Sequence, residues 1–201
     1  MSVQNILNVF ELATPEEVKA GIVWYAEAQK CAKLVSREYS VPLHIVVGVI
    51  AALSPNNKWE RNVVNAEELI VAFLNGEDMD SVKVSTYHTM KRKAWSILEA
   101  MPRTRDGVIE ILNGQKIVAF FRCIMGDRRA CCVDGHARNI YYAERLGLTD
   151  NGTNIGKKEY AVLADAYFAA AETLSVGDRT YHAYEVQAIT WVAWRRVHGI
   201  K

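Results

Sequence analysis

Proline, cysteine and long apolar runs are scarce in this chain of 201 residues. It has 4 prolines and 4 cysteines, and no two cysteines form a C-x-x-C pair. The apolar run at 41–53 is interrupted by Pro42 and His44 and is far too short to span a membrane. The N-terminus lacks a basic segment followed by an apolar one, so no secretory signal is predicted. We therefore expect reduced thiols in a cytoplasmic protein.

An excess of charge of one sign is also missing. The 24 Lys and Arg residues nearly balance the 23 Asp and Glu residues, which leaves a formal net charge of +1. Binding to nucleic acid would therefore need a local basic face. No metal site is expected, because none of the histidines has the sequence spacing to a cysteine or an acidic residue that metal ligands require. These histidines are His44, His88, His136, His182 and His198. No cofactor is expected either.

No segment shows the alternation of a β-strand, whereas helix signals are frequent. Thr14-Pro15-Glu16-Glu17 is a strong helix start, and 44–53 is apolar nearly all round, as in a helix buried at the centre of a bundle. A polar loop is expected at 151–156. The remaining helices are expected at about 3–12, from the Thr14 start to 39, and at 58–74, 87–100, 107–112, 116–125, 137–146 (closed by Gly147), 158–173 and 183–198. The fold class is therefore predicted to be all-α.

A tight turn, Asn113-Gly114-Gln115, separates two of these helices, and Lys116 follows it. Backbone N–H groups at the start of the second helix could bind a phosphate without reading sequence. Gly114 suits such a turn because glycine permits positive φ and a close backbone approach. The alternative is a surface loop with a solvated lysine. The basic runs at 91–93 and 128–129 likewise suit either phosphate contacts or a solvated face.

Asp134 follows the apolar residues 131–133 and precedes Gly135-His136. A carboxylate that emerges from an apolar segment is expected to be half-buried, with altered proton affinity or with a partner. Two structural alternatives remain open. Asp134 could be the N-cap of the helix starting near Ala137, or it could belong to a core ion pair. A packed or helix-capping role is the simpler reading of His136.

Together these motifs resemble the helix-hairpin-helix DNA glycosylase superfamily of the endonuclease III type. I-L-N-G-Q-K-I-V-A corresponds to its hairpin L-P-G-V-G-R-K-T-A, and V-D-G-H-A-R-N-I-Y-Y-A-E-R-L-G to V-D-T-H and the helix ending in R-L-G. L-S-P-N-N-K-W-E-R-N-V-V-N-A is similar to L-S-x-Q-x-x-D-x-x-V-N-x-A, and T-M-K-R-K-A-W-S-I-L to Y-x-x-K-A-x-x-I. The separation of Lys116 and Asp134 is also that of the family.

The resemblance implies a two-lobed helical bundle. It is expected as a single globular unit over 1–201, with a helix-hairpin-helix-like core at about 44–148 and helices of 1–43 and 149–201 packed on it. The iron–sulfur loop of many members is absent, because no cysteine follows Cys132. The chain also resembles small proteins of bacterial viruses with S-P-N-N-x-W-x-R-N and V-D-G-H-A, which implies a divergent bacteriophage-type member in the host cytoplasm.

The implied function is that of a DNA base-processing enzyme. A nucleotide of double-stranded DNA would rotate into a pocket between two lobes, where the N-glycosidic bond is cleaved. Asp134 would stabilise charge on the sugar, and Lys116 would form a Schiff base that permits strand cleavage. Contacts to substrate or DNA are expected from Asn56, Asn57, Trp59, Arg61, Asn113, Gly114, Gln115, His136, Arg138 and Gln187. For the two asparagines and Trp59, helix capping and core packing are the alternatives.

Two other functions stay open. Some viral relatives of this fold act in thymine hypermodification, so the chain could join an amine or amino acid to an activated 5-hydroxymethyluracil in DNA. Lys116 would then neutralise a leaving phosphate and Asp134 would act as the base. Gln187 shares one face of the last helix with Tyr184, Trp191 and Trp194, and a buried amide needs partners. The third function is a DNA-binding module without catalysis. The base and the oligomeric state are open.

Overall fold

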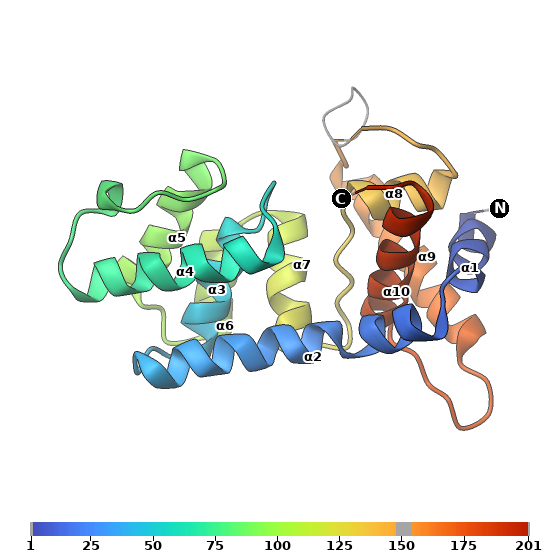
Figure 1. Ribbon diagram of the computed structural model, residues 1–201, viewed down its shortest axis with the longest axis horizontal. Coiled ribbons are helices and arrows are strands. Elements are labelled where there is room, and N and C mark those ends of the chain that lie inside the picture. The colour runs from blue at the N-terminus through green and yellow to red at the C-terminus, as the bar shows by residue number, and fades with distance from the viewer. Residues whose placement is uncertain (1, 148–153, 201) are drawn as a thin grey trace. The chain divides into compact units, whose positions relative to one another are not determined.

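A computed structural model describes residues 2–147 and 154–200 of the chain. Within these residues the structure contains ten α-helices, one short 3-10 helix and no β-strand (Figure 1). The prediction of an all-α fold class is confirmed. The polar loop expected at 151–156 lies partly outside the described residues.

The chain divides into two compact units. We call Met1–Ala26 together with Gly126–Lys201 the terminal unit, and Glu27–Met125 the middle unit. Helix α2 (Pro15–Glu38) runs through the boundary, so its first half belongs to the terminal unit and its second half to the middle unit. The expected single globular unit with a core at 44–148 stays a prediction.

The middle unit is organised around α3 (Leu43–Leu53). All of 45–53 is buried, as expected for a helix that is apolar nearly all round. Gly48 allows a close approach of two helices, because a Cβ there would lie 2.6 Å from Val108 Cγ1. The helices that contact α3 are α4 (Trp59–Leu74), α5 (His88–Ala100), α6 (Arg105–Leu112) and α7 (Gln115–Ile124). A 3-10 helix, η1 (Met79–Ser81), lies in the acidic connection between α4 and α5.

The terminal unit joins the two ends of the chain. Its helices are α1 (Ser2–Glu11), the first half of α2, α8 (Gly135–Tyr142), α9 (Lys157–Leu174) and α10 (Ala183–Val197). The predicted start of α2 is confirmed. Thr14 N–H donates to Glu17 Oε2 at 2.9 Å, and Glu17 N–H donates to Thr14 Oγ1 at 3.3 Å. Glu17 also pairs with Arg196 of α10 at 2.7 Å, so the same carboxylate caps one helix and holds another.

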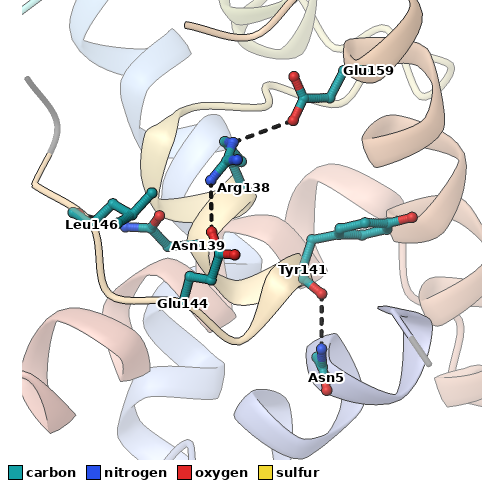
Figure 2. Close-up of polar contacts among 7 residues, drawn as sticks. All are labelled: Asn5, Arg138, Asn139, Tyr141, Glu144, Leu146 and Glu159. Carbon is teal, nitrogen blue, oxygen red and sulfur yellow. Dashed lines mark hydrogen bonds and ion pairs between the residues drawn. The ribbon is translucent and has the colours of Figure 1, made fainter. Parts of the chain in front are cut away.

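Helix α8 differs from the prediction of 137–146. It begins at Gly135 and ends at Tyr142, because Ala143 adopts a left-handed conformation with φ of 53°. The carbonyls at this end are then satisfied locally, since Glu144 N–H donates to Asn139 O at 2.9 Å. Asn139 Nδ2 in turn donates to Leu146 O at 2.8 Å, and this bond holds the chain that leaves α8 (Figure 2).

Candidate functional site

The hairpin expected around Gly114 is present between α6 and α7, with a different conformation from the one predicted. Asn113 takes the left-handed position, with φ of 42°, and its N–H donates to Ile109 O at 3.0 Å. Gly114 is extended, with φ of −138°, so the expectation of positive φ there is wrong. The glycine is favoured by space instead, because a Cβ would lie 3.1 Å from Ile117 Cγ1. No side chain caps the start of α7 at Gly114.

Two lysines border this hairpin and differ in environment. Lys116 is exposed in the first turn of α7. Lys93 of α5 is half-buried, and its ammonium donates to the carbonyl of Leu112, the last residue of α6. Burial lowers the pKa of Lys93. Lys93 therefore holds the last carbonyl of α6, where the hairpin begins, whereas Lys116 is exposed to solvent. The role of Lys116 as a nucleophile stays a prediction.

The basic run at 91–93 divides into three separate environments. Lys91 is 6% exposed and pairs with Asp80 at 3.4 Å, in the connection between α4 and α5. Arg92 is exposed, and Lys93 lies against α6. A continuous phosphate-binding strip is therefore not formed by this run. The spacing of basic residues in the sequence did not indicate that Lys91 pairs with Asp80 or that Lys93 donates to the Leu112 carbonyl.

Asp134 is the N-cap of α8. Its Oδ1 accepts a hydrogen bond from Ala137 N–H at 2.9 Å, which confirms the capping alternative. The side chain is half-buried, and the preceding residues 130–133 are buried. Tyr160 of α9 fixes this segment, since its hydroxyl accepts from Val133 N–H and donates to Cys131 O, both at 3.1 Å. Among the described residues, the bond from Ala137 N–H is the one hydrogen bond that the Asp134 carboxylate accepts.

The first turn of α8 faces aromatic and cationic side chains of α10. His136 is buried, and its ring centroid lies 6.4 Å from that of Trp191 in an edge-on arrangement. The guanidinium of Arg195 lies 4.3 Å above the Trp191 ring. Because Asp134 begins the same helical turn as His136, the carboxylate, the imidazole and this Arg–Trp pair belong to one region of the terminal unit.

Gln187 of α10 is 6% exposed and has the partner that a buried amide requires. Its Oε1 accepts from Tyr25 Oη at 3.0 Å. Tyr184, one turn earlier in α10, packs edge-on against Tyr25 with centroids 5.4 Å apart. Trp194 is buried and Trp191 is half-buried. This face of α10 thus combines packing with hydrogen bonding, and the binding role of Gln187 stays a prediction.

Arg138 is engaged inside the terminal unit. Its guanidinium pairs with Glu144 at 3.1 Å and with Glu159 of α9 at 3.2 Å, as Figure 2 shows. It also lies 4.6 Å above the Tyr142 ring, and its side chain is 13% exposed. Arg138 therefore stabilises the end of α8 and its junction with α9. The predicted contact with DNA would compete with these ion pairs.

The polar residues before and within α4 lie in the middle unit. Asn56 is exposed with φ of 54°, and Asn57 Nδ2 donates to Leu53 O at 3.3 Å, which confirms helix capping for Asn57. Arg61 Nε donates to Ser85 Oγ at 3.3 Å. Trp59 begins α4 and is half-buried.

Asn62 was not among the expected site residues, and the structure gives it a structural role. It is 2% exposed, and its Nδ2 donates to Ile50 O at 3.0 Å. This buried asparagine, one turn into α4, thus donates a hydrogen bond to a backbone carbonyl in the last turn of α3.

The predicted site residues therefore fall into two sets. The hairpin (Asn113 to Lys116) and the segment from Asn56 to Arg61 lie in the middle unit, whereas Asp134, His136, Arg138 and Gln187 lie in the terminal unit. Among the described residues, no group of three histidines, cysteines or acids is placed to hold a metal ion. In the same residues, no helix has both the length and the apolar character needed to cross a bilayer.

Comparison with known proteins places the chain in one family. The model of DUF7178, described as a family of unknown function, matches residues 1–198, so the chain belongs to this family. Neither a curated protein nor a solved structure matches the chain.

Proposed function

We propose that this member of the DUF7178 family is a DNA base-processing enzyme that cleaves an N-glycosidic bond with the help of Asp134. The observation that carries the proposal is the state of this carboxylate. It is half-buried at the start of α8, and one oxygen is fixed by Ala137 N–H, with no other hydrogen bond in the described residues. A carboxylate held in one orientation can stabilise positive charge that develops next to it.

The hairpin between α6 and α7 supports DNA as the substrate. The turn at Asn113 and Gly114 leads directly into α7. The N-cap residue of α7 is Gly114, so the first backbone N–H groups of this helix have no hydrogen-bonding cap from the side chain of the N-cap residue. Such a helix start binds phosphate oxygens irrespective of sequence. Lys116, exposed in the same turn, adds a cation. This combination suits binding to the DNA backbone, whereas Asp134 supplies the chemistry.

In the proposed reaction the base leaves the sugar with the bonding electrons and takes up a proton from solvent, and positive charge develops at the anomeric carbon. Water adds to that carbon and loses a proton, so the products are a free base and an abasic site. Asp134 lowers the barrier by stabilising the charged sugar, and losing one such group costs roughly 3–4 kcal/mol. Lys116 remains the candidate nucleophile for an additional lyase step.

The test uses duplex oligonucleotides that each carry one altered base, incubated with the full chain and then with alkali to cleave abasic sites. We expect base release from one of them, reduced about 10²–10³-fold in Asp134→Asn. Lys116→Gln should weaken DNA binding and lower its salt slope by about 1. Borohydride trapping, compared between the wild type and Lys116→Ala, tests the Schiff base. DNA binding without base release from any substrate would support a non-catalytic module and refute the proposal.

A second candidate, a base-modifying transferase, is favoured by the polar and aromatic face of α10. Arg195 over Trp191 could bind an anionic group, and the Tyr25–Gln187 pair could bind an amino acid. An amine would attack the 5-methylene carbon of a phosphorylated 5-hydroxymethyluracil, the phosphate would leave, and Asp134 would take the proton of the amine. Incorporation of a labelled amine into such DNA, lost in Gln187→Ala, is the expected result. DNA that remains unlabelled would eliminate this candidate.

A further inference from the structure

The segment that leads into Asp134 is buried without belonging to a helix. Residues 130–134 lie between α7 and α8, and the first four of them are buried. Backbone N–H and C=O groups that are buried outside a helix need hydrogen-bond partners from other parts of the chain. The position of Asp134, at the end of this segment, therefore depends on the groups that hold the backbone in front of it.

One side-chain hydroxyl of α9 binds this segment in both directions. Tyr160 Oη accepts from Val133 N–H at 3.1 Å and donates to Cys131 O, also at 3.1 Å. A tyrosine hydroxyl has one proton to donate and can accept as well, so these two bonds use both capacities. They fix the peptide groups immediately before Asp134.

The backbone after Asp134 is also bound to the first turn of α9. Glu159 pairs with Arg138, one turn after Asp134, at 3.2 Å (Figure 2). Between these two contacts, Asp134 Oδ1 accepts from Ala137 N–H at 2.9 Å. The neighbouring residues Glu159 and Tyr160 thus hold α8 and the segment before it, so the orientation of the carboxylate depends on α9 as well as on its own helix.

The ring and the hydroxyl of Tyr160 contribute different interactions. The half-buried ring packs against the apolar core of the terminal unit, and a phenylalanine would keep that packing. The hydroxyl contributes the two hydrogen bonds, and its loss would leave buried groups of Cys131 and Val133 without this partner. Because unpartnered buried groups are costly, we expect the segment to shift toward other partners. A displacement of a reacting group by about 1 Å can cost about 10²-fold in rate.

We infer that Tyr160 is a positioning residue for Asp134, and that its hydroxyl holds the carboxylate in the orientation that the proposed base chemistry uses. The inference rests on the proposed function, because it assigns Tyr160 an effect on that reaction through Asp134. In this role Tyr160 makes no contact with the sugar or the base. Removal of the hydroxyl should therefore slow base release without weakening the binding of DNA.

The test compares Tyr160→Phe with Tyr167→Phe, using the duplex oligonucleotide from which the wild type releases a base. Tyr167 lies further along α9, is fully buried, and has its hydroxyl 3.5 Å from Thr190 Oγ1. Its replacement removes a hydroxyl from the same helix without touching residues 130–134. We expect Tyr160→Phe to lower kcat about 10–100-fold with an unchanged KM, and Tyr167→Phe to keep the kcat of the wild type. An equal loss of kcat in both variants would show a general weakening of the terminal unit and overturn the inference.

A double substitution shows whether Tyr160 acts through the carboxylate. Once Asp134→Asn has removed the charge, its orientation no longer matters, so adding Tyr160→Phe should slow base release no further. A purely structural contribution of Tyr160 would instead add its own loss to that of Asp134→Asn. Additive losses would therefore overturn the inference.

Amide hydrogen exchange, followed by NMR in the full chain, tests the positioning without any reaction. The N–H groups of Val133 and Ala137 should exchange faster in Tyr160→Phe than in the wild type and in Tyr167→Phe, because the first loses its acceptor and the second loses a fixed Asp134. Unchanged exchange at Ala137 would show that Asp134 keeps its orientation without the hydroxyl and would overturn the inference. A wild type that releases no base would instead refute the proposed function, and faster exchange at Ala137 would still show that Tyr160 holds Asp134.

Discussion

Replacing Asp134 separates a structural role from a chemical one, because the side chain both caps α8 and is the proposed catalytic carboxylate. Asn and Ser keep an oxygen that can accept from Ala137 N–H, whereas Ala does not. We therefore expect Asp134→Ala to lower the free energy of unfolding by about 1 kcal/mol, within a range of about 0.5–2 kcal/mol. For a chain of this length that corresponds to roughly 2–4 °C in Tm.

The effect on base release should follow a different order. The substitutions Asp134→Asn, Asp134→Ser and Asp134→Ala all remove the negative charge, so each should reduce base release about 10²–10³-fold regardless of stability. Thr14→Ala is the matched control, since it removes the N-cap of α2 in the same unit without touching α8. It should lose a similar amount of stability and keep its activity.

Urea and thermal unfolding of these variants, measured beside base release, test the reasoning. If Asp134→Asn is as unstable as Asp134→Ala, the hydrogen bond to Ala137 is not what the side chain contributes to the fold. If Asp134→Asn or Asp134→Ser releases base at the wild-type rate, the carboxylate has no catalytic role. A large loss of activity in Thr14→Ala would show that the assay reports stability rather than chemistry.

Three more predictions concern stability. The hydrogen bond with Arg196 lowers the pKa of Glu17, so its contribution is present above about pH 4.5 and fades as the pH falls through the lowered value. The Tm difference between the wild type and Glu17→Gln should therefore shrink as the pH falls further below about 4.5, and a constant difference would contradict the ion pair. Lys93→Met leaves the half-buried carbonyl of Leu112 without its donor and should cost about 1 kcal/mol in urea unfolding. Asn113→Ala should cost about 1–2 kcal/mol and Asn113→Gly much less, since only the former strains the left-handed position; equal stability of both variants would refute this.

The start of α2 was predictable because its signals are local. Thr14, Pro15 and Glu17 each act within one turn, and the structure starts the helix at Pro15. The end of α8 was not predictable in this way. Ala143 has no intrinsic preference for positive φ, and the turn depends on the bond from Asn139 to Leu146 O.

The candidate site shows the same limit. The capping role of Asp134 could be foreseen, because its partner lies three residues away. The role of Arg138 could not, since Glu159 lies 21 positions along the chain in another helix. Lys93 and Leu112 are 19 positions apart, and the sequence gives no indication that one supports the other. At the hairpin, either Asn113 or Gly114 could accept positive φ, and packing of Ile117 against Gly114 favours the observed choice.

The buried helix α3 has a consequence for synthesis of the chain on the ribosome. It is the most apolar helix of the structure, yet its partners α4 to α7 follow it in sequence and end only at Ile124. At about 5–20 residues per second, translation from Leu53 to Ile124 takes roughly 4–14 s, and during this time α3 lacks part of its cover. Nascent chains stopped before α7 should therefore bind chaperones through 43–53, and release should follow once Ile124 has emerged.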